Sequence, residues 1–308
     1  MRKIGLQSLL MTIAVVTALP VHAALNVFAC EPEWGALVAQ LGGDRVEVYT
    51  ATNGMQDPHQ IQARPSLIAH ARKADLTVCT GGELEIGWMP MIIRQAANSK
   101  IAAGSEGDFQ AASYIHLLEV PTRLDRADGD VHAAGNPHIQ TDPRNILTVA
   151  KALTDRLATV DAPNADWYRS RYSDFSTRWT AALQRWQAQA TPLKGIPVAV
   201  QHKSWIYMFD WLGLKEVVAL EPKPGVPPSS GYLAQVLEEV RRQPVRMVIR
   251  AAYEDPRPSA FFSDHDHVPA VVLPFTIGGT DAAKDLFSLY DDTIQSLLKA
   301  LNDAAPQS

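Results

Sequence analysis

The chain has 308 residues, 46% of them hydrophobic, and a formal net charge of −5 with an isoelectric point near 6.0. This length suggests two domains, each large enough to bury a core of its own. Because the charge balance is acidic, the chain offers no basic surface for a nucleic acid, and we expect no nucleic-acid partner.

The N-terminus has the three-part pattern of a secretory signal peptide. Arg2 and Lys3 precede an apolar run over residues 9–16, and Val21-His22-Ala23 provides a cleavage site. The run is shorter than the ~20 residues that a membrane-spanning helix needs. We therefore expect residues 1–23 to be a signal peptide cleaved near Ala23, and the mature chain to be a soluble periplasmic protein. A lipoprotein is the main alternative, although the bulky Phe28 suits a lipid-attachment box ending at Cys30 poorly.

Strands and helices alternate after the signal peptide. Strands are expected at residues 25–29, 46–50 and 76–79, and helices at 33–41, 65–73 and 85–97. Strands separated by helices indicate a parallel sheet covered on both faces, so we expect residues 24–163 to form an N-terminal α/β lobe.

Two helices without a strand between them occupy the middle of the chain, at residues 145–160 and 165–190. The segment Asp161-Ala162-Pro163-Asn164 separates them and supplies a start for the second helix. That helix lacks Gly and Pro, which indicates a rigid connecting helix over residues 164–190. We expect Trp179 and Trp186 to pack this connector.

The alternation then resumes in the last third of the chain, which we expect to form a C-terminal α/β lobe over residues 191–308. Its strands are predicted at 197–200, 216–220, 245–249 and 271–273, and its helices at 204–212, 230–242 and 282–301. The predicted fold class is therefore α/β, with two small lobes of parallel sheet joined by the long helix. Ligands of open α/β sheets bind at the carboxyl ends of strands, so the cleft between the lobes is the expected site.

The two cysteines, Cys30 and Cys79, each lie at the end of an apolar strand-like run, and we expect the chain to be exported to an oxidising compartment. If the two strands are neighbours, their ends can be bridged by a disulfide. Two buried thiols remain equally consistent with the sequence, because the sequence does not give the Cα separation.

Three histidines, His59, His138 and His202, stand in loops that follow predicted strands or precede a helix. Pro58 and Pro137 stiffen the backbone just before two of them, which suits pre-positioned ligands. A neutral imidazole is a common zinc ligand. Spacing alone leaves ordinary structural histidines as a comparable alternative.

The order of motifs resembles a known family. The motifs are Asp57-Pro58-His59, then Asn136-Pro137-His138 with Asp142-Pro143, then the long helix, then strand-borne His202. This layout, together with Gly82-Glu83-Leu84-Glu85, resembles the zinc-binding solute receptors of ABC transporters, the ZnuA/TroA-like cluster A-I proteins, over residues 24 to about 303.

The resemblance implies two lobes with a metal buried between them, small hinge motion, and delivery of the ion to an ABC permease in the inner membrane. It implies that His59 and His138 are ligands from the first lobe and His202 the ligand from the second. Related receptors for manganese or iron place a carboxylate where His202 stands, and three neutral nitrogens favour Zn²⁺.

The fourth ligand departs from the family pattern. Family members with a carboxylate ligand place it after the last core strand, where the nearest acid here is Asp281, displaced by several residues. Asp281 is the fourth candidate ligand, with a helix N-cap as its alternative role and water as the alternative ligand. Weaker carboxylate candidates are Glu31, Glu33 and Glu221.

The remaining histidines are expected to lie outside the site. His132 follows a short acidic stretch where many family members carry a His-rich loop, and we favour a solvated loop over a role in metal capture. His265 and His267 are expected in an exposed turn, and His70 and His116 in structural positions.

Three functions compete for this sequence. A transport receptor would bind one metal per chain without turnover, as a monomer and not an enzyme. A secreted zinc hydrolase also uses three ligands and a water, but the sequence has no HExxH helix, and Glu83 or Glu85 would have to serve as its base. A metal-binding surface adhesin with the same fold is the third. We favour the receptor.

Overall fold

The computed structural model describes residues 24–123, 129 and 132–304. The predicted signal peptide, residues 1–23, lies outside the described residues. No helix in the described part of the chain is long and apolar enough to cross a membrane.

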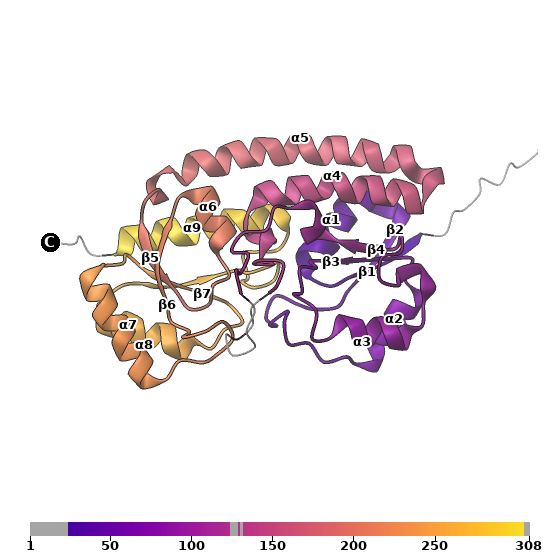
Figure 1. Cartoon of the computed structure of the whole chain (residues 1–308). Coiled ribbons are helices and arrows are strands. Elements are labelled where there is room, and N and C mark those ends of the chain that lie inside the picture. Colours follow the sequence, from indigo (N-terminus) through magenta and orange to yellow (C-terminus); the bar gives the residue numbers. More distant parts are fainter. Residues whose placement is uncertain (1–23, 124–128, 130–131, 305–308) are drawn as a thin grey trace, which may run out of the picture.

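Two parallel sheets of four strands each form the two lobes, as the alternation predicted (Figure 1). The first has the order β2-β1-β3-β4 and the second β6-β5-β7-β8, and every pairing in both is parallel. The strands are β1 Leu25–Ala29, β2 Val46–Thr50, β3 Leu76–Cys79, β4 Asp108–Gln110, β5 Pro197–Val200, β6 Lys215–Ala219, β7 Val248–Ala251 and β8 Ala270–Leu273.

Helices flank the sheets and connect the strands. The α-helices are α1 Pro32–Gly42, α2 Pro65–Lys73, α3 Met89–Ala96, α4 Pro143–Val160, α5 Ala165–Gln189, α6 Ile206–Leu212, α7 Ser230–Arg242, α8 Pro256–Asp266 and α9 Leu286–Asp303. The three-residue strand β4 was missed because so short a run carries no readable periodicity. The expected strand at 245–249 lies instead at 248–251.

Helix α8 corrects the prediction of a turn at His265, whereas His267 lies in an exposed turn as predicted and His265 is exposed as well. Pro256 begins the helix and Asp255 caps it by accepting a hydrogen bond from the backbone N–H of Arg257, so His265 lies in the last turn. His267 ends the helix in a left-handed conformation. The helix start signal at Asp255-Pro256 was present in the sequence and outweighs the polar composition of the helix end.

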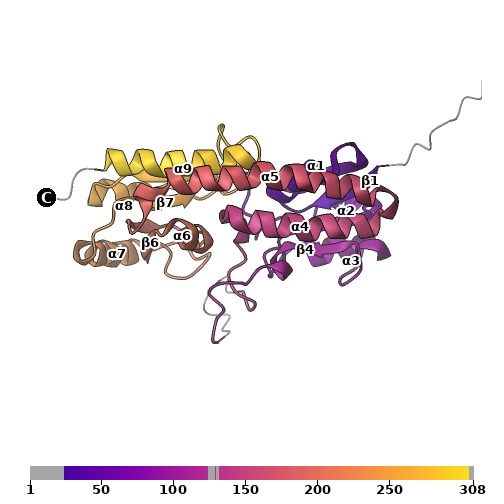
Figure 2. The same cartoon turned by 90° about the horizontal axis from the view of Figure 1, so that it is seen from above.

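The connecting helix α5 spans both lobes, and its 25 residues correspond to a length of about 37 Å. Figure 2 shows it beside α4 over the first lobe and beside α9 over the second. One buried apolar cluster continues from Val27 in β1 through Trp179 in α5 to Val200 in β5. The lobes are therefore joined by a shared core as well as by the chain.

The disulfide question is decided in favour of a bridge. Strands β1 and β3 are neighbours, so Cys30 and Cys79 follow adjacent strand ends with their Cα atoms 4.8 Å apart and their sulfurs bonded. The bridge links the carboxyl ends of β1 and β3, the two inner strands of the first sheet.

Close contacts join the two lobes at the loop after β8. A Cβ atom placed on Gly54, in the loop after β2, would lie 2.3 Å from the carbonyl carbon of Gly278, in the loop after β8. The hydroxyl of Thr276 in that same loop donates a hydrogen bond to the carboxylate of Glu33 in α1. The loops after β2 and β8 thus approach each other so closely at Gly54 that no side chain fits between them.

Candidate metal centre

The three predicted histidines meet between the lobes. His59 lies in the loop after β2, His138 lies before α4, and His202 lies in the loop after β5, so all three stand in loops at the ends of regular elements. One ligand nitrogen from each lies within 4.8 Å of the other two. Nitrogens bound to one tetrahedral zinc lie about 3.4 Å apart, given Zn–N bonds of about 2.0–2.1 Å, so a small inward movement suffices.

The two Pro-His motifs orient their imidazoles in the same way. The Asp57 carboxylate accepts hydrogen bonds from the backbone N–H of His59 (2.9 Å) and contacts its ring Nδ1 (2.8 Å). The side-chain oxygen of Asn136 does the same for His138, at 3.1 and 2.7 Å. Since the proline between the two residues fixes φ, the acceptor two residues earlier sets the direction of each ring.

The third imidazole is oriented from a different strand. Nδ1 of His202 lies 2.7 Å from Oε2 of Glu221, which also accepts the backbone N–H of Gly225 at 2.9 Å. Glu221 therefore supports a ligand and is not itself one of the grouped ligands. An acceptor facing each Nδ1 requires its proton, so the lone pair of every neutral ring lies on Nε2.

The free ring nitrogens fit a metal ion. Nε2 of His59 and Nε2 of His138 are buried and have no hydrogen-bond partner among the described residues. A buried acceptor without a donor costs free energy unless something binds it. Three converging neutral Nε2 atoms form a donor set suited to a divalent transition metal.

The surroundings of His138 and His202 shift the pKa values of these two imidazoles in opposite directions. Burial, followed by the charges of His59, His202 and His132, lowers the pKa of His138 well below its usual value, so this ring is neutral. Burial also acts to lower the pKa of His202, but the hydrogen bond and charge of Glu221 outweigh it and raise that pKa. As the pH falls, a metal ion must therefore compete with a proton more strongly at His202 than at His138.

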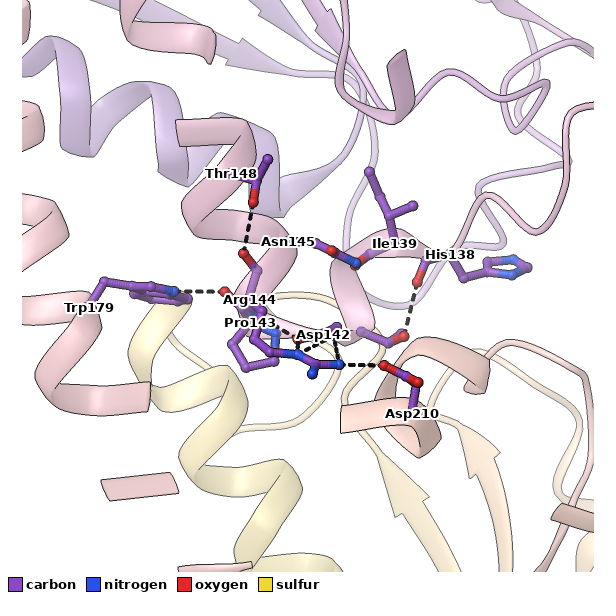
Figure 3. A network of polar contacts seen from close by, with 10 residues as sticks. His138, Ile139, Asp142, Pro143, Arg144, Asn145, Thr148, Trp179 and Asp210 are labelled. Carbon is purple, nitrogen blue, oxygen red and sulfur yellow. Dashed lines mark hydrogen bonds and ion pairs between the residues drawn. The ribbon is translucent and has the colours of Figure 1, made fainter. Parts of the chain in front are cut away.

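The segment after His138 is fixed by contacts within the first lobe and across to the second (Figure 3). The hydroxyl of Thr141 donates to the His138 carbonyl, and the Asn145 amide donates to the Ile139 carbonyl. Asp142 caps α4, and Arg144 bridges it to Asp210 of the second lobe. The imidazole of His138 points away from this network (Figure 3), and it lines the cavity that it shares with His202.

Asp281 is not brought to the histidines. Its side chain is exposed, and it is not part of the metal-ligating group found among the described residues. It does not cap α9 either, because Asp285 forms the capping box of that helix. Asp281 as a ligand stays a prediction without geometric support.

His132 corrects a prediction. Its ring centroid lies 5.3 Å from that of His59 and 6.4 Å from that of His138, and it lines the same cavity of about 220 Å³ as His138 and His202. The preferred solvated-loop interpretation is therefore wrong. No local pattern could show this, since the loop is held by Glu83, 50 residues earlier, which accepts the backbone N–H of Ala133 at 2.6 Å.

Two further histidines have clear placements. His70 in α2 stacks on Tyr49 with ring centroids 3.5 Å apart, which is a structural role as predicted. His116 is exposed. A carboxylate that sequence reasoning missed is Glu254 after β7, which interacts with His202 and whose pKa burial raises to about 7. Its loop has no local pattern that distinguishes it from an exposed turn.

The arrangement defines a class of protein, the two-lobed metal-binding receptor. The chain belongs to the family described as zinc-uptake complex component A, periplasmic, whose model matches residues 27–304.

Individual relatives and structures are similar over most of their length. The high-affinity zinc uptake system protein ZnuA of Paracoccus denitrificans is 24% identical over 96% of this chain and 97% of its own. The manganese ABC transporter substrate-binding lipoprotein PsaA of Streptococcus pneumoniae is 21% identical over 78% of this chain and 76% of its own.

Among solved structures, a zinc-bound ZnuA deletion mutant superposes with a TM-score of 0.75 at 21% identity, covering 93% of this chain and all of that one. FpvC from Pseudomonas aeruginosa, in complex with Mn²⁺, gives a TM-score of 0.77 at 18% identity over 92% of this chain and all of its own. These likenesses confirm the two-lobed fold.

The Asp57–His59 contact leads to a test of ligand support. We expect Asp57→Ala to lower metal affinity about 10- to 100-fold, as loss of a group that orients a metal ligand does. Asp57→Asn should cost much less, because Asn136 already performs the same role for His138 in this chain. Titration calorimetry on metal-stripped protein measures both. Equal losses in the two variants would mean that the charge of Asp57, not its acceptor oxygen, matters.

A buried carboxyl cluster lies behind the site. Glu31, Glu33 and Glu85 are all buried, and the backbone N–H groups of Thr80 and Gly81 donate to Glu85. Burial, the charges of Glu85 and Glu33 and a hydrogen bond with Glu85 raise the pKa of Glu31 well above its usual value. Burial raises the pKa values of Glu33 and Glu85 to about 7. Glu31 and Glu33 are thus protonated or shared-proton groups of the core and are not metal ligands in this geometry.

This cluster predicts a stability that falls as the pH rises. A carboxyl group whose pKa is raised in the folded state keeps its proton between about pH 4.5 and 7, while the unfolded chain releases it, so folding is opposed increasingly across that window. We expect Glu31→Gln, which stays neutral, to be more stable than wild type at pH 8 and little changed at pH 5, because the pKa of Glu31 is raised in the folded state. Urea unfolding of metal-free protein at both pH values measures this, with the exposed Glu47→Gln as the control. An equal shift at both pH values would contradict the prediction.

Proposed function

We propose that this chain is a monomeric periplasmic receptor that binds one Zn²⁺ ion through His59, His138 and His202 and delivers it to an ABC permease in the inner membrane. Export requires removal of residues 1–23 near Ala23. The observation that carries the proposal is the convergence of three imidazoles whose Nδ1 atoms are each held by an acceptor and whose Nε2 atoms are left for a metal.

Zinc is favoured over manganese by the type of ligand. All three members of the group offer nitrogen, whereas manganese prefers a larger share of carboxylate oxygen. The supporting carboxylates of Asp57 and Glu221 face Nδ1 atoms and do not belong to the ligand group. Relatives of this chain are named for zinc and for manganese, so the donor set is the argument that separates the two.

Catalysis is not part of the proposed function. The two carboxylates considered as general bases of a hydrolase are both engaged, since Glu85 accepts backbone N–H groups of Thr80 and Gly81 and Glu83 accepts that of Ala133. A base that activates a metal-bound water needs a free carboxylate beside the metal. We therefore expect binding without turnover.

The direct test is the metal content of protein secreted into the periplasm and purified without added metal. Mass spectrometry of the intact protein should show a chain beginning after Ala23, and elemental analysis about one zinc per chain. Titration of the stripped protein should give a 1:1 complex with zinc that is tighter than the one with manganese. One manganese per purified chain, with the order of affinities reversed, would overturn the choice of metal.

A further inference from the structure

A fourth imidazole, that of His132, lies close to two members of the trio. The ring centroids of the trio are 5.3 Å apart for His59 and His138, 5.7 Å for His138 and His202, and 6.0 Å for His59 and His202. The ring of His132 is 5.3 Å from that of His59 and 6.4 Å from that of His138. His132 therefore matches the spacing of the trio toward His59 and lies slightly farther from His138.

His132 also faces the same space. It lines the cavity of about 220 Å³ together with His138 and His202. Its ring is inclined by 29° to that of His59 and by 86° to that of His138. His59 does not line this cavity, but its ring lies beside that of His132, so four imidazoles are gathered here. Four match in number the positions of a tetrahedral zinc, of which the trio fills three.

The backbone on the C-terminal side of His132 is held by the first lobe. The carboxylate of Glu83 accepts the N–H of Ala133 at 2.6 Å, and Glu83 itself adopts a left-handed conformation with φ of 71°. The carbonyl of His132 accepts the N–H of Gly135 at 3.2 Å, and the next residue, Asn136, donates its N–H to the carbonyl of Leu118. A left-handed conformation costs free energy at a residue other than glycine. At Glu83 this conformation accompanies the hydrogen bond between its carboxylate and the N–H of Ala133.

We propose that His132 is the fourth protein ligand of the bound ion, which gives a site of four nitrogens in place of three nitrogens with water or with Asp281. This inference rests on the proposed function, since it concerns the same ion. Glu83 is then a positioning residue, which acts through the backbone of Ala133. A site of four neutral imidazoles excludes water from the ion and disfavours manganese more strongly than three do.

The test counts the imidazoles on the metal. X-ray absorption spectroscopy of zinc-loaded protein resolves the outer-shell scattering of coordinated rings, and we expect four in wild type and three in His132→Ala. His265→Ala, which removes an exposed imidazole of α8, is the matched control and should keep four. Zinc affinity should fall by more than about 100-fold in His132→Ala, the size of loss expected for a ligand, and stay unchanged in His265→Ala. Three imidazoles in wild type, unchanged in His132→Ala, would overturn the proposal.

Glu83→Ala separates positioning from ligation. With the anchor of Ala133 removed, we expect the Co²⁺-substituted protein to show the same change in its visible d–d absorption as His132→Ala, while Glu83→Gln, which retains an acceptor oxygen, stays close to wild type. Four imidazoles in Glu83→Ala would refute the positioning role and leave His132 as a ligand.

Failure of this inference is distinguishable from failure of the proposed function. Stripped wild-type protein that binds no zinc at 1:1 would refute the receptor itself, whereas zinc bound by three imidazoles and an oxygen would refute only the role of His132.

Discussion

Replacing His138 or His202 with alanine is expected to lower the affinity for zinc by more than about 100-fold. Loss of a group that merely supports a ligand costs 10- to 100-fold, and loss of the ligand itself should cost more. His138 is buried with a pKa held well below its usual value, so its neutral ring is available to the metal across the physiological range. His202 is the trio's only member from the second lobe, so without it the ion no longer joins the lobes.

Titration calorimetry of each metal-stripped variant measures this loss. Circular dichroism and thermal unfolding without metal serve as the check that the fold is intact, and His265→Ala is the control for removing a histidine elsewhere. Unchanged affinity in both His138→Ala and His202→Ala would refute the assignment of the site.

Replacing Trp179 with alanine should reduce the free energy of unfolding by about 3–5 kcal/mol, the usual cost of removing a fully buried large aromatic side chain. Its indole is inaccessible to solvent and packs against Trp186, Phe287 and Tyr290. Its Nε1 donates to the carbonyl of Pro143 at 2.8 Å (Figure 3). These contacts tie α5 to α4 and α9, and so to both lobes.

Urea unfolding monitored by circular dichroism measures the loss. Trp167→Ala on the same helix is the matched control, because Trp167 is 37% exposed and should cost clearly less. A loss of similar size in both variants would show that the helix, and not the buried cluster, sets the effect.

The sequence predicts the two-lobed fold well because its cues are local. Alternating apolar runs and helical spacing place six of the strands close to their positions in the structure. The stretch over residues 165–190 has no Gly or Pro, and it predicts α5 almost to its ends. The Asp57-Pro58-His59 and Asn136-Pro137-His138 motifs are also local, since each acceptor lies two residues before its imidazole. Strand β4 was missed because its three residues are too few to show an alternation of apolar and polar side chains.

Long-range contacts account for what the sequence could not predict at the site. His132 reaches the cavity because Glu83, far away in the chain, holds its neighbour. Glu221 orients His202 across adjacent strands, and its expected role as a weak ligand candidate gave no sign of this. The bridge between Cys30 and Cys79 depended on β1 and β3 being neighbours, which only the strand order establishes.

Because Gly54 lies against the backbone of Gly278 and Gly279, the size of the side chain at position 54 can be used to vary the separation of the lobes. Because a single Cβ there already overlaps backbone on the other lobe, the series alanine, valine and leucine would act as a wedge of graded thickness. Every imidazole would remain in place chemically while the distance between His202 and the first-lobe ligands increased. Affinity plotted against wedge size would then report how steeply metal binding depends on closure, independently of which ligands are present.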